Sequence, residues 1–493
     1  MRQPPSFYRC LLCTSLTVLA LPAHADDKVE EVVVTASRVE KPLSTIPNTV
    51  TVIDQAALAQ QLSIQNDLSS VLGKLIPSFS PARQKMTNAG ETLRGRKPLY
   101  LIDGIPQSNP LRSGGRDGHT ISPLMLERVE VLHGANAIHG LGAAGGIINL
   151  ITKRPTETLE QSLRVDVGFQ TERVSESLNR GVHYSVSNRI DQFDVLASVG
   201  FRDNGIAYDA NGEVIGVDNT QGDTMASEQY DVFLKTGYNW NDQRVELMVN
   251  RFNVESDHKW TSVPGDVDAD IPTPAIRAEL PAEGARNRVT TIGLSYENPE
   301  ILGHSLRVQA FKQDFEATYG AQITPIATFQ DPAYGPDLID QSQNNSEKIG
   351  AKITLAKDQV GGLPLSLVYG IDILQDKTWQ ELVQTGRAWV PETRYNNYAP
   401  YLQAEFTGIE NATLTAGVRH EESKLDVDDF TPLFRYGSQF VKGGAPDFSE
   451  TLYNIGGTYQ FTERWRAFAN YAEAFSMPDV GRVMSASPTR PAA

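Results

Sequence analysis

The sequence predicts a membrane β-barrel that follows a smaller α+β domain at the N-terminus. Three observations lead to this fold class: a series of alternating segments of strand length, connections that are alternately short and long, and an N-terminal export signal. No apolar run beyond that signal reaches the roughly 18 residues of a spanning helix. The 493 residues carry a net charge of −16, which argues against a nucleic-acid-binding protein.

Residues 1–25 have the features of a cleaved signal peptide. A basic start is followed by a short apolar stretch, Leu11–Leu21, and by a small-x-small cleavage pattern at 23–25. Both cysteines, Cys10 and Cys13, fall in this segment, so the rest of the chain offers no disulfide and no thiol nucleophile. We expect an exported protein that begins near Asp26.

Residues 41–155 have the sequence pattern of a compact domain. Apolar residues at helical spacing predict one helix over 54–72. Short β-like runs separated by glycine-rich turns predict strands at 32–37, 49–53, 99–102, 128–132 and 147–152.

From residue 160 to 493 the sequence changes to segments with a period of two. We expect thirteen strands, near 161–170, 182–189, 193–201, 229–239, 244–252, 287–296, 305–315, 346–355, 364–376, 395–407, 412–421, 450–460 and 464–473. Each has about the 9–11 residues that a tilted strand needs to cross a bilayer.

The connections between these strands alternate in length. Short turns at 190–192, 240–243, 298–304, 356–362, 408–411 and 461–463 alternate with long polar loops at 202–228, 253–286, 316–345, 377–394 and 422–449. This alternation is typical of an outer-membrane barrel, with outer-membrane lipid around it. Because bacterial single-chain barrels have even strand numbers, thirteen strands predict a barrel truncated at the C-terminus.

The mature N-terminus, residues 26–40, contains a short extended-prone segment suited to pairing with the sheet edge of a partner. Its residues are Glu31, Val32, Val33, Val34, Thr35 and Ala36.

These motifs together resemble the TonB-dependent outer-membrane receptors. The 31–36 segment resembles the TonB box, the pairs Arg94-Gly95 and Asp103-Gly104 resemble core motifs of the plug domain, and Gly145–Lys153 resembles its closing signature. The resemblance implies that 41–155 is a plug inside the lumen of a 22-stranded barrel, of which about thirteen strands are present. It also implies TonB, with its inner-membrane energising complex, as a partner.

The resemblance further assigns roles to single residues. Arginines at the positions of Arg94 and Arg128 hold the plug in the barrel by pairing with barrel glutamates, for which Glu421 and Glu473 are the candidates. The expected ligand-binding residues lie in two outward plug loops, where a cationic floor in an acidic protein would attract an anionic ligand. They are Arg83, Lys85, Leu111, Arg112 and Arg116.

Other motifs are better explained by structure alone. Gly140-x-Gly142-x-x-Gly145 matches a dinucleotide fingerprint, but a strand-like run follows it where a helix is needed. Asp266-x-Asp268-x-Asp270 lacks the glycine and the final glutamate of a calcium loop, and the histidines show no metal spacing. We expect no enzyme, no cofactor, no resident metal and no nucleic-acid partner.

The predicted function is TonB-dependent uptake of a ferric siderophore. Haem, cobalamin or another metal chelate, a truncated non-transporting product, and a signalling receptor are the alternatives. The sequence does not name the chelate.

Overall fold

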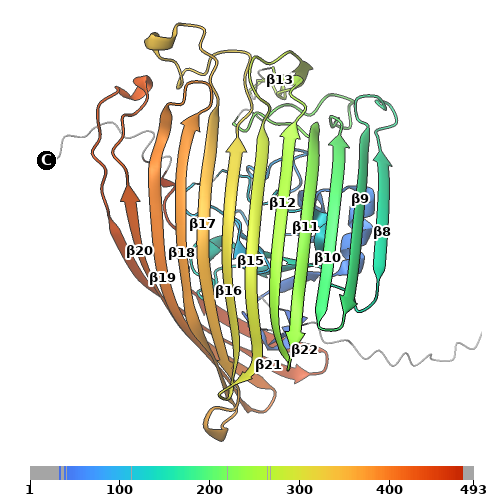
Figure 1. Cartoon of the computed structure of the whole chain (residues 1–493), viewed down its shortest axis with the longest axis vertical. Coiled ribbons are helices and arrows are strands. Elements are labelled where there is room, and N and C mark those ends of the chain that lie inside the picture. Colours follow the sequence, from blue (N-terminus) through green and yellow to red (C-terminus); the bar gives the residue numbers. More distant parts are fainter. Residues whose placement is uncertain are drawn as a thin grey trace, which may run out of the picture. The chain divides into compact units, whose positions relative to one another are not determined.

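The computed structural model describes residues 33–34, 38–39, 41–112, 114–218, 220–263, 265–266, 268–480 and 483. They belong to one compact unit, Val33–Ala493. The predicted signal peptide lies outside the described residues, as do Glu31, Val32, Thr35 and Ala36 of the predicted TonB box. Within this unit a small sheet with two helices lies against one large antiparallel sheet (Figure 1).

The plug is a five-stranded sheet with strand order β3-β6-β7-β4-β5. Its elements are β3 (Val50–Ile53), α1 (Gln55–Ile64), α2 (Leu68–Leu75), β4 (Leu99–Ile102), β5 (Ile105–Pro106), β6 (Leu126–His133) and β7 (Gly146–Thr152). Strands β4 and β7 pair in parallel, and every residue of both is buried. Continuous apolar runs such as Leu99–Ile102 suit strands that are covered on both faces.

The single helix expected over 54–72 is two helices. Asp54 caps α1 by accepting a hydrogen bond from the Ala57 amide (2.8 Å), and Asp67 caps α2 by accepting one from the Ser70 amide (2.9 Å). An aspartate that satisfies amide groups of the following turn begins a new helix. The second aspartate therefore ends the periodic stretch that the sequence suggested and starts another.

The large sheet forms a wall of thirteen antiparallel strands, the number that the sequence predicts. They are β8 (Glu160–Gly168), β9 (Asn179–Ile190), β10 (Phe193–Asn204), β11 (Ser227–Trp240), β12 (Gln243–Ser256), β15 (Arg286–Ile301), β16 (His304–Thr318), β17 (Ser342–Lys357), β18 (Leu365–Leu382), β19 (Ala388–Ile409), β20 (Ala412–Val427), β21 (Asp447–Thr462) and β22 (Trp465–Ala472). Two small pairs complete the strands: β1 (Val33–Val34) with β2 (Lys41–Pro42), and β13 (Trp260–Ser262) with β14 (Ala275–Arg277).

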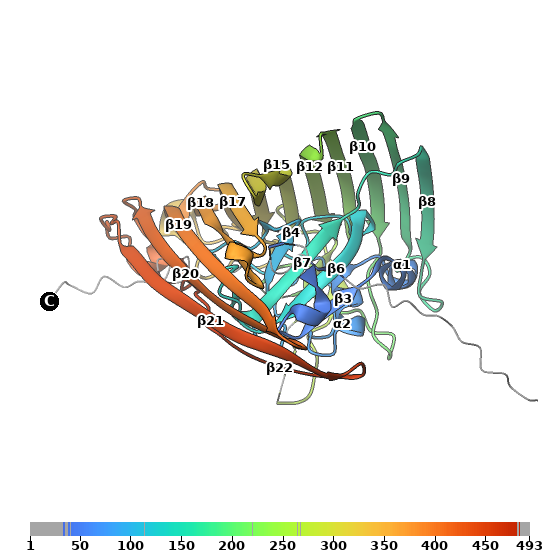
Figure 2. The ribbon, with the colours of Figure 1, turned by 90° about the horizontal axis from the view of Figure 1, so that it is seen from below.

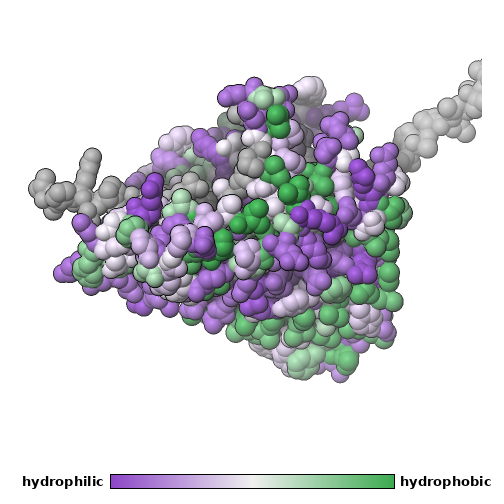
Figure 3. Space-filling view, turned by 90° about the horizontal axis from the view of Figure 1, so that it is seen from above, coloured by the Kyte–Doolittle hydropathy of each residue, from purple (hydrophilic) through white to green (hydrophobic). Residues whose placement is uncertain are grey.

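The wall has two chemically different faces. On β11 the outward residues Tyr230 and Val232 are 43% and 46% exposed, whereas Asp231, Phe233 and Lys235 point inward and are buried. Large hydrophobic side chains are exposed on the outward positions of many other strands. Figure 3 shows hydrophobic side chains along the wall at the lower right and hydrophilic ones over much of the loop surface. An apolar outer face and a polar inner face suit a wall surrounded by lipid.

The strand connections follow the predicted alternation, with one correction. The short turns use residues with positive φ, such as Asn241 (44°) and Asp242 (63°), which is the geometry of tight hairpins. The stretch 377–394 is not a long loop, because β18 continues to Leu382 and β19 begins at Ala388. Alternation of buried and less buried residues, which defines a strand, continues through both segments.

The plug packs directly against the inner face of the wall. One hydrophobic cluster joins Ile102 and Ile105 of the plug to Phe233, Met248 and Phe311 of the wall. Seen from below, the wall strands curve around the plug elements (Figure 2). None of the described helices has the length and apolar character needed to cross a membrane.

Candidate functional site

The chain is attached to the wall immediately after the predicted TonB box. The Arg38 guanidinium donates two hydrogen bonds to the Asp372 carboxylate on β18 (2.6 and 2.5 Å) and one to the Ile138 carbonyl (2.6 Å), and it lies 4.5 Å from the centre of the Tyr401 ring. Burial alone would lower the pKa of Arg38, but Asp372 raises it above its ordinary value. Lys41 adds a second ion pair, to Glu405 on β19 (2.6 Å).

Asp372 has a second cationic partner. Arg419 on β20 donates to the same carboxylate (2.8 Å), to Glu421 (2.6 Å) and to the Ile138 carbonyl (3.1 Å). Gly140 of the plug lies against this cluster, and a Cβ there would meet a Glu421 carboxylate oxygen at 2.2 Å. Asp372 is therefore still paired if Arg38 leaves.

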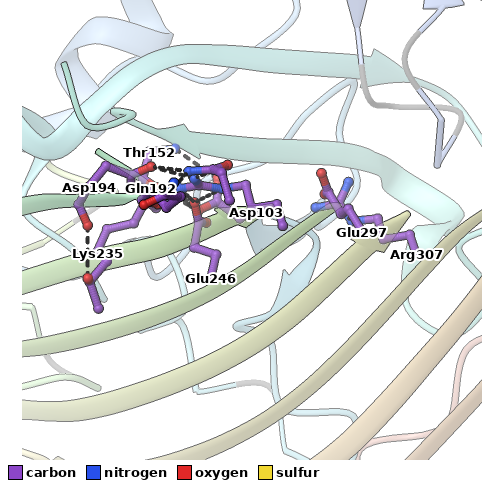
Figure 4. A network of polar contacts seen from close by, with 11 residues as sticks. Asp103, Thr152, Gln192, Asp194, Lys235, Glu246, Glu297 and Arg307 are labelled. Carbon is purple, nitrogen blue, oxygen red and sulfur yellow. Dashed lines mark hydrogen bonds and ion pairs between the residues drawn. The ribbon is translucent and has the colours of Figure 1, made fainter. Parts of the chain in front are cut away.

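A second attachment holds the tip of the plug hairpin between β4 and β5. Lys235 on β11 pairs with the Asp103 carboxylate (3.1 Å), which also accepts hydrogen bonds from the Thr152 amide (2.9 Å) and hydroxyl (2.6 Å). Lys352 donates to the Gly104 carbonyl (2.6 Å). Figure 4 shows this network between plug and wall side chains.

The hairpin network adjoins a cavity of about 1040 Å³ between the plug and the wall. Its lining includes Arg38 and Val39 from the N-terminal segment, Asp103 from the hairpin, and wall residues around the short turns of β9 to β16. The segment that follows the predicted TonB box thus forms part of the cavity wall.

The predicted plug–barrel pairs are wrong. Arg128 pairs with Glu127 (3.2 Å) and Glu130 (2.9 Å) of the plug, and Glu421 pairs with Arg419 of the wall. Glu473 accepts hydrogen bonds from Tyr471 and from the Tyr453 amide. Arg94 is exposed and makes no ion pair with a described residue. Such pairs depend on how far along its strand each residue lies and on where its side chain points. A sequence motif specifies neither.

The five predicted ligand-binding residues lie at the opposite end of the plug from the short turns. Arg83 pairs with Asp218 of the loop after β10 (2.6 Å), and Arg112 pairs with Asp479 (2.9 Å). Lys85 is buried, and burial lowers the pKa of its amine while Asp223 opposes the shift. Leu111 packs with Tyr395 and Leu425.

Arg116 is, with Leu111, the most enclosed of the five, each at 1% exposed. Its guanidinium donates to Asn287 (2.6 Å), to Gln221 (2.7 Å) and to the Thr318 carbonyl (3.2 Å). Burial lowers its pKa. The structure brings four of the five side chains into contact with the wall or its loops, and their contact with a ligand stays a prediction.

The glycine run does not form a nucleotide-binding turn. Gly140 and Gly142 have φ of 69° and 87°, and β7 follows at Gly146 where a dinucleotide fold places a helix. Asp266, Asp268 and Asp270 lie in an exposed loop. In the part of the chain that the structure describes, no group of three His, Cys, Asp or Glu side chains could hold a metal ion.

A sheet with an apolar outer face and a globular plug packed on its inner face is the architecture of a plugged membrane β-barrel. The family model "TonB dependent receptor-like, beta-barrel" matches residues 207–492, and "TonB-dependent Receptor Plug Domain" matches residues 42–147. The chain therefore belongs to the TonB-dependent receptor family, an outer-membrane family of transport receptors.

Two curated relatives are siderophore receptors. The chain is 28% identical to the rhizobactin receptor of Rhizobium meliloti (strain 1021), with 93% of this chain and 65% of the relative covered. It is 26% identical to the ferric aerobactin receptor of Klebsiella pneumoniae, with 95% of this chain and 67% of the relative covered. The chain thus spans about two thirds of the length of these relatives.

Solved structures share the fold. The ferric citrate transporter FecA in its unliganded form has a TM-score of 0.67 at 15% identity, covering 89% of this chain and 65% of that chain. The ferric-catecholate import receptor Fiu from E. coli K12 has a TM-score of 0.64 at 15% identity, covering 89% and 71%.

Sequence reasoning missed the residues that attach the plug. Asp103 was noticed as part of a motif, but its partner Lys235 was not. The signal was available, because a lysine two residues from Phe233 in a period-two segment shares its inward face. Asp372 could not have been matched with Arg38, because 334 residues separate them.

Proposed function

We propose that this chain is the receptor part of an energy-coupled uptake system for a ferric siderophore in the outer membrane. The observation that carries the proposal is a plug fixed inside the wall by ion pairs, in a chain related over 93% of its length to a rhizobactin receptor. Moving a plug that is held by such ion pairs costs free energy, so we infer that an energy source drives the opening.

TonB is the proposed energy source, and the segment around Val33–Val34 is its proposed attachment. The two described residues of this segment, Val33 and Val34, pair with the two-residue strand β2, Lys41–Pro42. A pair of two-residue strands is weak, so a partner strand can replace it by strand addition. Force on this segment acts first on Arg38, which lines the cavity between plug and wall.

The test separates binding from uptake. Val34→Pro removes the backbone donor and with it strand addition, so uptake of radiolabelled iron should fall to background while cells still bind the ferric chelate. Val34→Thr keeps the donor and the extended preference and should transport normally. Loss of binding in Val34→Pro, or normal uptake by it, would contradict the proposed coupling.

The transported chelate is tested with a panel. Ferric rhizobactin and ferric aerobactin are the first probes, with haem and cobalamin as competitors that represent the alternatives. Saturable uptake of either ferric chelate that haem and cobalamin do not reduce supports the siderophore assignment, and the reverse order of preference rejects it. Export through a cleaved signal peptide at 1–25 is checked by N-terminal sequencing of the mature protein.

A further inference from the structure

A turn of the loop between β10 and β11 lies on the outward end of the plug. This turn, residues 218–224 with 219 outside the described part, is called the 218–224 turn below. The Met86 amide donates to the Thr224 carbonyl (3.2 Å), and Arg83 donates to the Asp218 carboxylate (2.6 Å). The 218–224 turn is therefore joined to the plug by a backbone hydrogen bond and an ion pair.

The opposite side of the 218–224 turn is in contact with the loop that follows β16. The Gly320 amide donates to the Gln221 carbonyl (2.9 Å). Gly222 has φ of 66°, and a Cβ there would lie 2.5 Å from the Gly320 Cα. The turn is thus closely packed between the plug and a neighbouring loop.

Under this turn lie three of the cationic residues that the sequence predicts to attract an anionic ligand. Arg83 pairs with Asp218, Lys85 is 7% exposed, and Arg116 donates to the Gln221 side chain (2.7 Å). Asp223 of the turn is fully buried, and the charges that act most strongly on it include Arg116 and Lys85. The carboxylates of two loop residues thus lie close to three cations of the plug.

We propose that Asp218 and Asp223 are built-in competitors for the binding floor, displaced when an anionic ferric chelate carrying at least two carboxylates binds. The proposal rests on the proposed function and adds the ligand's charge class. Three plug cations lie near two carboxylates of the 218–224 turn. A ligand with two carboxylates can therefore supply the same negative charge as Asp218 and Asp223. A neutral chelate would leave the buried amine of Lys85 without an anion, which is unfavourable.

The two aspartates have opposite effects on the stability of the 218–224 turn in this position. Asp218 accepts hydrogen bonds from the Thr220 hydroxyl (2.7 Å) and the Gln221 amide (2.9 Å) as well as from Arg83. Burial alone would raise its pKa, but these donors lower it to about 2. It is therefore a well-stabilised anion.

Asp223 is the opposite case. Burial raises its pKa, and the Thr87 hydroxyl and the nearby cations Arg116 and Lys85 oppose this shift only in part. A buried carboxylate whose burial is compensated only in part costs free energy. The docked turn therefore contains one strong contact and one unfavourable group, which makes it displaceable by a competing ligand.

The first experiment compares the two partners of one ion pair. Asp218→Asn removes the competing anion, so the affinity for ferric aerobactin, a carboxylate-bearing chelate, should rise about two- to five-fold, the range of an exposed ion pair. Arg83→Gln removes the cation that the ligand needs, so the affinity should fall about ten-fold. Neutral ferrichrome should respond to neither variant in this way.

The matched control is an ion pair between two other loops. Arg277 of β14 pairs with Glu176 of the loop between β8 and β9 (2.9 Å), and Glu176→Gln and Arg277→Gln should leave the affinity unchanged. A pair that only stabilises the loop would shift affinity in the same direction when either partner is removed. If Asp218→Asn and Arg83→Gln change the affinity in the same direction, the proposal is overturned.

A second experiment needs no ligand. It therefore tests the inference even if ferric chelates do not bind and the proposed function is wrong. Thr87 is 1% exposed and its hydroxyl interacts with the Asp223 carboxylate, so Thr87→Cys places a thiol beneath the turn, the only one within residues 26–493. Its reaction with anionic and cationic methanethiosulfonate reagents is measured in outer membranes. Adding Asp218→Asn should speed labelling and favour the anionic reagent, whereas unchanged rates or a preference for the cationic reagent would reject the cationic floor.

Discussion

The plug is attached to the wall at two places that differ in what remains when each is broken. The N-terminal attachment consists of Arg38 with Asp372, and Asp372 also binds Arg419. The hairpin attachment consists of Asp103 with Lys235, and Asp103 also receives two hydrogen bonds from Thr152 inside the plug. The first contact can be removed without leaving a buried carboxylate unpaired, whereas the second is integrated into the plug sheet.

From this difference we expect the start of the plug to be easier to release than its core. Arg38 lies among the first described residues of the chain, so a force applied at Val33–Val34 reaches it before it reaches the sheet. Asp103 lies between β4 and β5, and β4 pairs with β7. Release of the N-terminal segment would enlarge the cavity that Arg38 and Asp103 both line, while the core remains docked.

The largest expected effect comes from breaking the hairpin attachment. Among the described residues, Asp103→Ala leaves Lys235, which is 3% exposed, with the more distant Glu246 (3.6 Å) as its anionic partner, so hydrogen-exchange protection of β4 and β5 should fall by about 3–5 kcal/mol. Asp203→Ala, which breaks an exposed pair with Arg180 (2.8 Å), should cost less than about 1 kcal/mol. Equal losses would show that the hairpin is an ordinary surface contact.

The same attachment should not depend on pH near neutrality. Burial alone would raise the pKa of the Asp103 carboxyl, but Lys235 and Thr152 hold it below its ordinary value. Its stabilisation is therefore complete above the ordinary aspartate pKa of about 3.9 and is lost only as the pH falls through the lowered pKa.

The next largest effect should follow from Asp372→Asn. This change leaves both Arg38 and Arg419 without their shared carboxylate, at a cost of about 3 kcal/mol to the N-terminal attachment. Hydrogen exchange at the Val39 amide should become faster in this variant. An unchanged exchange rate would mean that Lys41 and Glu405 hold the segment on their own.

A pH effect of intermediate size should come from the core of the plug. Burial raises the pKa of Glu91 to about 8, and a hydrogen bond from the Ser69 hydroxyl (2.7 Å) opposes the shift only in part. Because the folded pKa exceeds the unfolded value of 4.5, folding stability should decrease as the pH rises from 4.5 to about 8.

Glu91→Gln should remove this dependence. We expect a gain of about 1–3 kcal/mol at pH 8 in the plug's resistance to unfolding and none below pH 4.5, measured by hydrogen exchange at both pH values. The exposed Glu422→Gln is the control and should shift nothing. A gain that is the same at both pH values would exclude titration of Glu91 as the cause.

The smallest effect is expected for Arg38→Met. Because Asp372 keeps its ion pair with Arg419, the N-terminal attachment should lose only about 1 kcal/mol of stability, the size of one hydrogen-bonded contact. Hydrogen exchange at the Val39 amide should become faster, but less so than in Asp372→Asn. An equal or larger effect than in Asp372→Asn would remove the distinction between the two attachments.

Much of the fold could be read from the sequence because its signals are local. The thirteen strands follow from alternation of neighbouring residues, such as Tyr230 with Asp231, and the short turns follow from residues such as Asn241 and Asp242. Where a local signal was ambiguous, prediction failed: Asp67 was read as part of one helix although it caps a second.

The candidate site was less predictable. The sequence placed Arg83, Lys85 and Arg116 together as cationic loop residues, but not beneath Asp218 and Asp223 of a distant loop. It pointed to Arg94 and Arg128 as attachments, whereas the plug is held through Arg38 and Asp103.

The sequence by itself determined the class of this protein: an apolar outward face, an inward polar face and a preceding compact domain are properties of residue order along each strand. Tertiary structure alone decided which charges meet. Asp372 lies 334 residues after Arg38, and Lys235 lies 132 residues after Asp103. Such pairs depend on strand register and on the position of the plug in the wall, which no local pattern specifies.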